Sequence, residues 1–112
     1  MTEISWEDFE KVDVRVGKVL EAEPFPEARK PTMKLSIDFG LEIGVKGTSA
    51  QLTAHYEPKE IVGKQVVAVV NFPSKRIAGF ESEVLVLGVP DKEGAVVLLA
   101  PDREVPLGGK MF

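Results

Sequence analysis

The sequence contains no cysteine and only one histidine, His55, among its 112 residues. Without cysteine it forms neither disulfide bonds nor a catalytic thiolate, and one histidine leaves too few ligands for a zinc site. No apolar run reaches about 18 residues, the length of a membrane span, and the acidic N-terminus lacks the apolar core of a signal peptide. We therefore expect one cytoplasmic domain over residues 1–112, with no bound metal.

Residues typical of catalytic and cofactor sites are also missing or wrongly spaced. The glycines of GLEIGVKG (40–47) do not have the spacing of a dinucleotide-binding loop, and PLGGKM (106–111) lacks the first glycine and the hydroxyl of a phosphate loop. The serines have no catalytic-triad context, and a lone histidine near a predicted helix start is usually a surface or capping residue. We therefore expect neither enzymatic activity nor a cofactor.

What the sequence does contain is a series of short apolar segments that predict β-strands. Leu35, Ile37 and Phe39 alternate with polar residues in the clearest of them, KLSIDFG (34–40). Further strands are predicted at residues 43–45, 66–70, 84–89 and 95–99. A short helix is predicted at residues 56–63, with a proline in its first turn and a glycine at its end.

The first strand is predicted to be long and bent. It covers residues 12–22, in which Val14, Val16 and Leu20 share one phase of a two-residue repeat. Gly17 and Lys18 interrupt this repeat, which indicates a bend or a bulge. Such a strand suits a barrel, in which the first strand often serves two sheets.

Five or six strands with one helix after the third favour a small closed barrel, because closure removes exposed sheet edges. The leading prediction is an all-β fold, a five-stranded Greek-key barrel of the OB type with short flanking helices. An open α+β sandwich is the second alternative.

The N-terminus predicts a short helix whose apolar face needs a partner. Ser5 and Asp8 have the spacing of a capping box, and Trp6, Phe9 and Val12 then lie on one side of the helix. Two of the later strands are apolar on both faces, which is more apolar surface than one small barrel buries. We therefore expect a two-fold homodimer, unless one face is covered within the chain.

Charge is unevenly distributed along the chain. The net charge is −4, yet residues 29–76 hold eight Lys and Arg against four Asp and Glu, a local net charge of +4. This distribution permits a basic face on an acidic protein, although solvated surface charge explains it as well.

The segment NFPSKRIAGFES (71–82) is longer than a connection between two strands needs to be. It combines Phe72, Phe80 and Ile77 with Lys75 and Arg76. Such a mixture is typical of single-stranded nucleic-acid sites, in which bases stack on aromatic rings and cations hold phosphates. It suits an extended peptide as well. Phe80 is left open between the core and the site.

Several segments, taken in order, resemble the free-standing tRNA-binding OB-domain family: DVRVGKV (13–19), FPEARKP (25–31), KLSIDFG (34–40), YEPKEIVGKQVVAVVNFPSKRIAGFESEVLVLG (56–88) and VPLGGK (105–110). The resemblance covers nearly the whole chain. Within the family, the pieces ARKP, SAQLT (49–53) and SEVLVLG (82–88) are most similar to its secretion-associated chaperones. Relatives that bind tRNA usually carry Ser-Glu-Gly-Met where this sequence has Ser82, Glu83, Val84 and Leu85.

The resemblance implies an OB barrel, a homodimer joined through its terminal segments and a cytoplasmic chaperone of protein secretion. The implied partners are unfolded precursor proteins or peptides and a SecA-type translocation motor, without membrane insertion. Structure-dependent tRNA binding by the same surface is the alternative, and an interaction module attached to an enzyme is the third. Val84 in place of a flexible glycine should stiffen the binding strand and make its surroundings more apolar.

The resemblance also implies a set of binding residues, placed by their positions in the motifs. The apolar ones should line a pocket: Met33, Phe72 and Ile77. The cations should attract carboxylates or phosphates: Arg29, Lys30, Lys75 and Arg76. The amides and one hydroxyl should hydrogen-bond a peptide backbone: Gln51, Asn71 and Ser82. The ligand should approach the main chain at Gly79, and the set is completed by Ser49 and Glu83.

Overall fold

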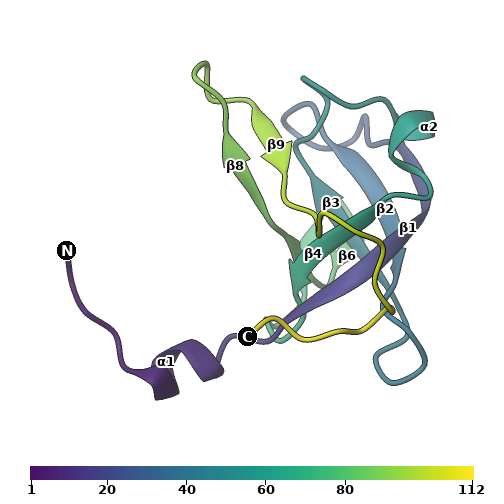
Figure 1. Cartoon of the computed structure of the whole chain (residues 1–112). Helices are drawn as coiled ribbons and strands as arrows, with labels where there is room; N and C mark the ends of the chain where they lie inside the picture. The colour runs from purple at the N-terminus through teal and green to yellow at the C-terminus, as the bar shows by residue number, and fades with distance from the viewer.

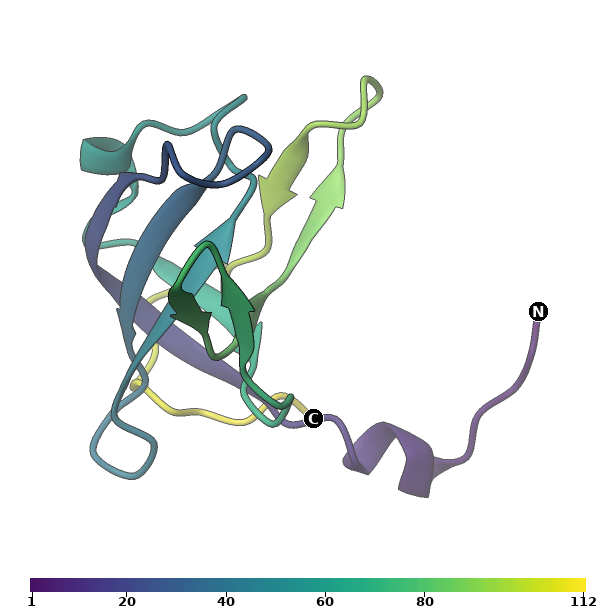
Figure 2. The same cartoon turned by 180° about the vertical axis from the view of Figure 1, so that it is seen from behind.

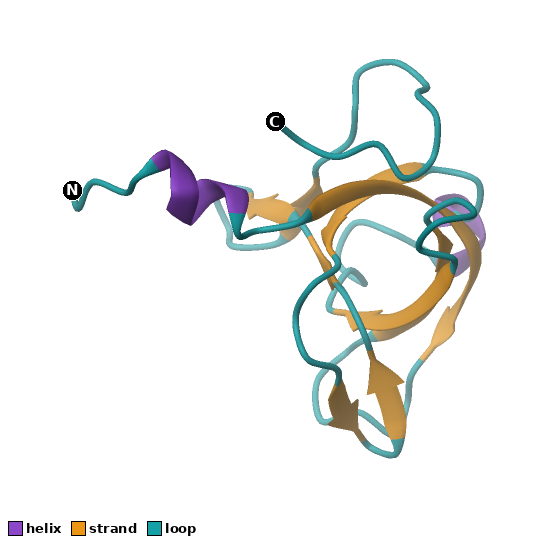
Figure 3. Cartoon of the chain, turned by 90° about the horizontal axis from the view of Figure 1, so that it is seen from below, coloured by secondary structure: helices purple, strands orange, loops and turns teal.

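The computed structural model describes residues 1–112 as a barrel of antiparallel strands with two short helices (Figure 1). In chain order the elements are α1 (Trp6–Glu10), β1 (Val14–Pro24), β2 (Met33–Asp38), β3 (Val45–Ala50), α2 (Pro58–Ile61), β4 (Gln65–Val69), β5 (Lys75–Ile77), β6 (Phe80–Ser82), β7 (Leu85–Val86), β8 (Gly88–Pro90) and β9 (Val96–Leu98). Five strands form one sheet in the order β3-β2-β1-β4-β7, which curls into a nearly closed ring (Figure 3). The predicted OB-type barrel is confirmed.

Strand β1 is long because it pairs with two neighbours in succession. Its first part, Val14–Lys18, pairs with β4, and its second part, Lys18–Pro24, pairs with β2. The register with β2 shifts between Val19 and Glu21, which is further along the strand than the predicted bend. Val19 packs in the core beside Ile37, its partner on β2, whereas Leu20 lies on the opposite face and is exposed. The apolar phase predicted from Val14, Val16 and Leu20 is therefore not the face that enters the core.

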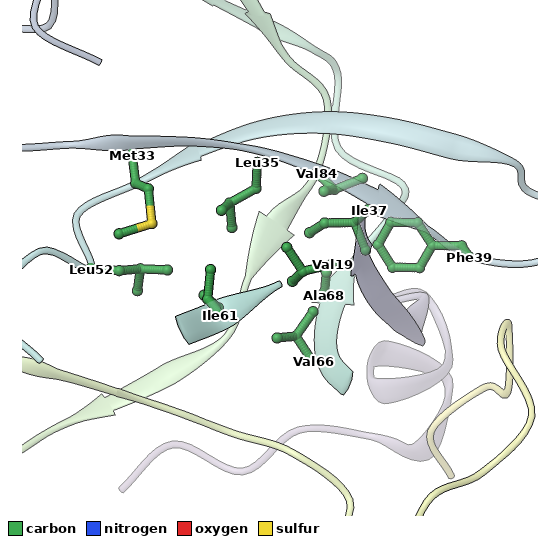
Figure 4. Packing of buried hydrophobic residues seen from close by; sticks show 10 residues of the cluster. All are labelled: Val19, Met33, Leu35, Ile37, Phe39, Leu52, Ile61, Val66, Ala68 and Val84. Atoms are coloured by element: carbon green, nitrogen blue, oxygen red, sulfur yellow. The ribbon is translucent and has the colours of Figure 1, made fainter. Parts of the chain in front are cut away.

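The core lies inside the ring, where apolar side chains from several strands meet (Figure 4): Val19, Met33, Leu35, Ile37, Phe39, Leu52, Ile61, Val66, Ala68 and Val84. The alternation predicted for β2 is confirmed, since Leu35, Ile37 and Phe39 are all buried. Met33 begins the same face and is 0% exposed, so it is a core residue. This corrects the prediction that Met33 lines a ligand pocket.

Helix α1 begins with the predicted capping box. Asp8 N–H donates to Ser5 Oγ at 3.1 Å, and Ser5 N–H donates to Asp8 Oδ2 at 3.2 Å. The helix lies away from the barrel in both side views (Figures 1 and 2). Trp6 is 63% exposed and lies close to Met111 and Phe112 of the C-terminal end. Its apolar face therefore stays largely exposed beside the chain's own C-terminus.

Helix α2 is shorter than the predicted helix 56–63, and its Ile61 enters the core. His55 precedes this helix but does not cap it, because the N-cap is Glu57. Instead, His55 Nε2 lies 2.7 Å from Asp91 Oδ2 of the turn between β8 and β9. Neither α1 nor α2 has the length and apolar character that crossing a bilayer requires.

The predicted strand at 84–89 is divided into β7 and β8. β7 pairs with β4 inside the barrel, whereas β8 leaves it and pairs with β9 in a hairpin that projects from the ring (Figure 1). Leu98 N–H of this hairpin donates to the hydroxyl of Tyr56 at 3.0 Å. The hairpin is thus held beside the loop that follows β3.

One main-chain and two side-chain hydrogen bonds complete the closure of the ring between β3 and residues 82–83 at the end of β6. Glu83 N–H donates to Gly47 O at 2.8 Å, and Gly47 N–H donates to Glu83 Oε1 at 3.0 Å. Ser49 N–H donates to Ser82 Oγ at 3.1 Å. We call this set of contacts the seam. It satisfies main-chain groups at the edge of β3 that a neighbouring strand would otherwise pair.

The seam also satisfies the one buried polar side chain of the barrel. Thr48 of β3 is buried, and its hydroxyl donates to Val84 O at 2.7 Å. A buried hydroxyl without a partner would be costly, so this bond fixes the start of β7 against β3.

The variant Ser82→Ala should lose about 1–2 kcal/mol in the free energy of unfolding, because the half-buried N–H of Ser49 would have no acceptor. Urea unfolding followed by circular dichroism measures the loss. Ser36→Ala is the matched control, because Ser36 is a half-buried serine of β2 that makes none of the seam contacts. Equal stability of the two variants would contradict the role of the seam.

Candidate binding groove

A continuous groove crosses the barrel beside the β5–β6 hairpin, which lies in front of the barrel in Figure 2. It consists of two adjoining cavities of about 540 Å³ and about 420 Å³. The residues that line both cavities are Ser49, Gln51, Lys75, Ile77 and Leu85. The other lining residues are Ala28, Arg29, Lys30, Thr32, Ala50, Leu52, Val86 and Val96 at one end and Phe72, Pro73, Ser82, Glu83 and Val84 at the other. We call this feature the groove.

The groove presents large apolar side chains to solvent. Phe72 is 54% exposed and Leu85 is 49% exposed, and Ile77 beside them is half-buried. Exposed apolar surface inside a concave site is typical of ligand binding. The structure thus brings Phe72 and Ile77 to one site, while their contact with a ligand stays a prediction.

The groove also carries an excess of positive charge. Arg29, Lys30 and Lys75 line it, and none of them has a carboxylate within 4.0 Å. The one carboxylate on its walls, Glu83, is bound to Gly47 in the seam and lies 3.8 Å from the ammonium of Lys46. On a protein with a net charge of −4, three unpaired cations in one groove favour an anionic group on the ligand.

Arg76 does not belong to this cationic set. Successive residues of β5 point to opposite faces, so Arg76 faces away from the groove when Lys75 and Ile77 face it. Its Nη1 donates to Glu81 Oε1 at 2.7 Å across the hairpin. The Ser74 hydroxyl and then the Arg76 guanidinium hold the pKa of the Glu81 carboxyl below its usual range. The prediction that Arg76 lines the site with Lys75 is therefore corrected.

Gly79 forms the turn of the β5–β6 hairpin and does not line the groove. Ala78 has φ 47° and Gly79 has φ 83°, and a type I′ turn needs positive φ at both central residues. No heavy atom lies within 4 Å of the position of a Cβ on Gly79. The prediction that a ligand approaches the main chain at Gly79 is therefore corrected: the glycine is needed for the conformation of the turn.

Asn71 also lies outside the groove, because its amide is used within the fold. Asp13 N–H donates to Asn71 Oδ1 at 3.0 Å, and Asn71 Nδ2 donates to Lys11 O at 2.7 Å. These bonds hold the end of β4 to the connection between α1 and β1. The prediction that Asn71 hydrogen-bonds a ligand is corrected accordingly.

Ser49, Gln51, Ser82 and Glu83 all lie on the groove, but they differ in what they offer a ligand. Ser82 Oγ and the Glu83 carboxylate accept hydrogen bonds from main-chain N–H groups of β3 and so belong to the seam. Gln51 is exposed, and its amide has no partner within the protein. Of these four residues, Gln51 is therefore the one whose side chain is free to hydrogen-bond a ligand.

Sequence reasoning missed Leu85, Val86 and Val96 as lining residues. For Leu85 and Val86 the signal is present in VLVL (84–87), and for Val96 in AVVLL (95–99). The sequence analysis assigns this apolar surface to a second subunit or to cover within the chain, and not to the site. In the structure Val84 is buried in the core, while the next residue, Leu85, faces the groove.

The chain is similar to known proteins over almost all of its length. Residues 14–110 match the family model described as "Putative tRNA binding domain". The structure matches the crystal structure of chaperone CsaA from Bacillus anthracis str. Ames with a TM-score of 0.92 and 53% sequence identity, covering 99% of this chain and 100% of that chain. It matches that of the CsaA chaperone protein from Picrophilus torridus with a TM-score of 0.91 and 50% identity, covering 98% and 100%.

Curated relatives include a much larger protein. The methionine–tRNA ligase of Porphyromonas gingivalis is 39% identical over 109 residues, which are 97% of this chain and 16% of the ligase. The chain therefore spans about a sixth of the length of the curated relatives it matches. Since the family model covers most of this chain and the first solved structure is matched over its full length, the chain belongs to the tRNA-binding domain family with the OB fold, and within it to the CsaA type.

Proposed function

We propose that the groove binds extended, partly apolar segments of unfolded precursor proteins, so that the protein acts as a CsaA-like chaperone in protein export. The observation that carries this proposal is the exposure of Phe72 and Leu85 in a concave surface that also holds unpaired cations. The two similar structures described above are of proteins named as CsaA chaperones, which supports the same role here.

The contacts proposed for the groove do not require a fixed substrate sequence. An extended segment turns alternate side chains to opposite sides, and the apolar ones would bury against Phe72, Ile77 and Leu85. Burial stabilises such contacts by about 25 cal/mol per Å² of apolar surface. The Gln51 amide can hydrogen-bond any peptide main chain, and the unpaired cations add attraction for substrate carboxylates.

In this role the protein holds precursors in the cytoplasm until a SecA-type translocation motor receives them. Each groove is open and shallow, so a single bound segment would dissociate readily. Two grooves on a homodimer would bind two segments of one unfolded chain, which raises the overall affinity without new contacts.

Binding of tRNA is the second candidate function, and the match to the tRNA-binding family model favours it. The same unpaired cations, Arg29, Lys30 and Lys75, would contact phosphates, and Phe72 offers a ring on which a base can stack. Val84 and Leu85 stand where tRNA-binding relatives usually carry glycine and methionine. Val84 packs in the core, so this difference should stiffen the strand beside the groove, while Leu85 and methionine are both apolar.

We also propose that the homodimer forms through a terminal patch, made by Trp6, Phe9, Val12, Met111 and Phe112. These residues surround a cavity of about 320 Å³ where the two ends of the chain meet. α1 has no contact with the barrel that would cover this patch (Figure 2). A second copy would bury it, as a self-complementary surface does in two-fold dimers.

The variant Phe72→Ala should weaken binding of a permanently unfolded protein, reduced and carboxymethylated lactalbumin, by about tenfold, the effect of losing part of one buried aromatic contact. Fluorescence anisotropy with labelled lactalbumin measures the affinity. Leu20→Ala is the matched control, because Leu20 is an exposed apolar residue outside the groove. Wild-type protein that fails to bind this probe would rule out the proposed function.

Lys75→Ala and Arg76→Ala are neighbouring variants that separate tRNA binding from peptide binding. If tRNA occupies the groove, Lys75→Ala should lower the salt dependence of tRNA affinity by about 0.7–0.9 in the logarithmic slope, the value of one phosphate contact. Arg76→Ala should leave that slope unchanged, because Arg76 faces Glu81 outside the groove. Filter binding over a series of salt concentrations measures both. A loss of slope in Arg76→Ala alone would contradict this placement.

Trp6→Asp should convert the dimer to a monomer, because a charge would be buried without a partner at the terminal patch. Sedimentation velocity at micromolar concentration gives the oligomeric state, with Leu20→Asp as an exposed apolar position outside the patch. The barrel should keep its circular dichroism spectrum, since α1 does not pack on it. Wild-type protein that sediments as a monomer would overturn the proposed dimer.

A further inference from the structure

The two cationic walls of the groove are a loop and a hairpin, and neither belongs to the five-stranded sheet. One wall is loop 25–32, which is closed on itself by Phe25 N–H donating to Thr32 O at 3.0 Å. The other is the β5–β6 hairpin, whose strands pair only with each other. No sheet ladder joins these walls to each other, and the hairpin is held to β3 only at its end, by Ser82 and Glu83. A direct contact between the walls would therefore help to fix their spacing.

Phe25, Phe80 and Lys34 supply such a contact, which we call the aromatic clasp. The Phe25 and Phe80 rings meet edge-on, with their centroids 5.7 Å apart and their planes at 74°. Lys34 Nζ lies 4.7 Å from the Phe25 centroid and 5.3 Å from the Phe80 centroid, within the range of a cation–π interaction. It also lies 3.9 Å from Glu23 Oε1. Each wall thus contributes one ring, and β2 contributes the cation above both.

Phe80 is also fitted against the barrel itself. A Cβ on Gly47 of β3 would lie 3.2 Å from Phe80 Cζ, so the missing side chain of Gly47 leaves space for the ring. Phe80 is paired with Ile77 across the hairpin, and paired residues share one face. The position of the Phe80 ring against β3 therefore affects the position of the Ile77 side chain in the groove.

The three residues of the aromatic clasp lie outside the groove, so they would not contact a ligand bound in it. None of the three lines either of its cavities, and Phe80 and Lys34 instead line a separate cavity of about 260 Å³. Any effect of the clasp on a groove ligand is therefore exerted through the two walls.

We propose that the aromatic clasp sets the spacing between loop 25–32 and the β5–β6 hairpin, and that Phe80 is a positioning residue for ligands of the groove. The second half of this inference rests on the proposed function, because it takes the groove as the ligand site. With the clasp broken, the walls move relative to each other, and a ligand has to order them as it binds. This cost appears mainly as faster dissociation.

The first test needs no ligand. Because the chain has no cysteine, introduced cysteines carry spin labels at chosen positions only. Glu27→Cys on the loop and Arg76→Cys on the outer face of β5 both lie outside the groove. Pulsed electron paramagnetic resonance then gives the distribution of distances between the walls. We expect Phe80→Ala to broaden it and Phe80→Tyr, which keeps the ring, to leave it narrow. An unchanged distribution in Phe80→Ala would overturn the clasp.

The second test measures binding of reduced, carboxymethylated lactalbumin by stopped-flow fluorescence, at a temperature where all variants are folded. Phe80→Ala should weaken binding about five- to tenfold through a higher dissociation rate, and Phe80→Tyr should restore it. Unchanged dissociation in Phe80→Ala, despite a broadened distance distribution, would overturn the positioning role. If wild-type protein does not bind the probe, the proposed function fails, whereas the distance measurement still decides on the clasp.

Discussion

Side chains hold the barrel closed at the place where the ends of its sheet, β3 and β7, come together. Ser82 and Glu83 accept hydrogen bonds from main-chain N–H groups of β3, and Thr48 donates one back to the start of β7. Without these bonds β3 would be a free edge strand with unpaired polar groups. Ser49, Ser82 and Glu83 also line the groove, so the groove lies directly on this closure. The bonds that close the barrel therefore also build one end of the groove.

This closure gives the motif Ser82-Glu83 a structural role in the barrel. Ser82 and Glu83 lie on the groove, but their acceptor atoms face the protein's own backbone. The two residues that follow them have separate environments, since Val84 is packed in the core and Leu85 is exposed in the groove. In this chain the apolar character of the groove therefore depends on Leu85, whereas the closure depends on Ser82 and Glu83.

Periodicity in the sequence predicted what depends on neighbours along the chain, and it failed where distant segments meet. The alternation in KLSIDFG (34–40) gave the buried face of β2, and the spacing of Ser5 and Asp8 gave the capping box. The place of a residue in a family motif, in contrast, indicates that the residue has a role, but it does not say which part of the protein or ligand the side chain contacts. Asn71 binds main chain near Asp13, 58 residues away, and no local pattern records that contact. Arg76 was misplaced for a simpler reason, because the short strand β5 was not recognised and its alternation could not be used.

The chain has a single tryptophan, Trp6, and the fold places it outside the barrel, at the meeting point of the two termini. The centroids of the Trp6 and Phe9 rings lie 5.3 Å apart, and α1, which carries both, lies outside the barrel (Figure 1), whereas the hydrophobic core in Figure 4 lies inside it. Intrinsic fluorescence is consequently a poor reporter of barrel melting or of groove occupancy in this protein. The same emission is instead a dye-free optical signal for any molecule that binds over the two chain ends and shields Trp6 from water.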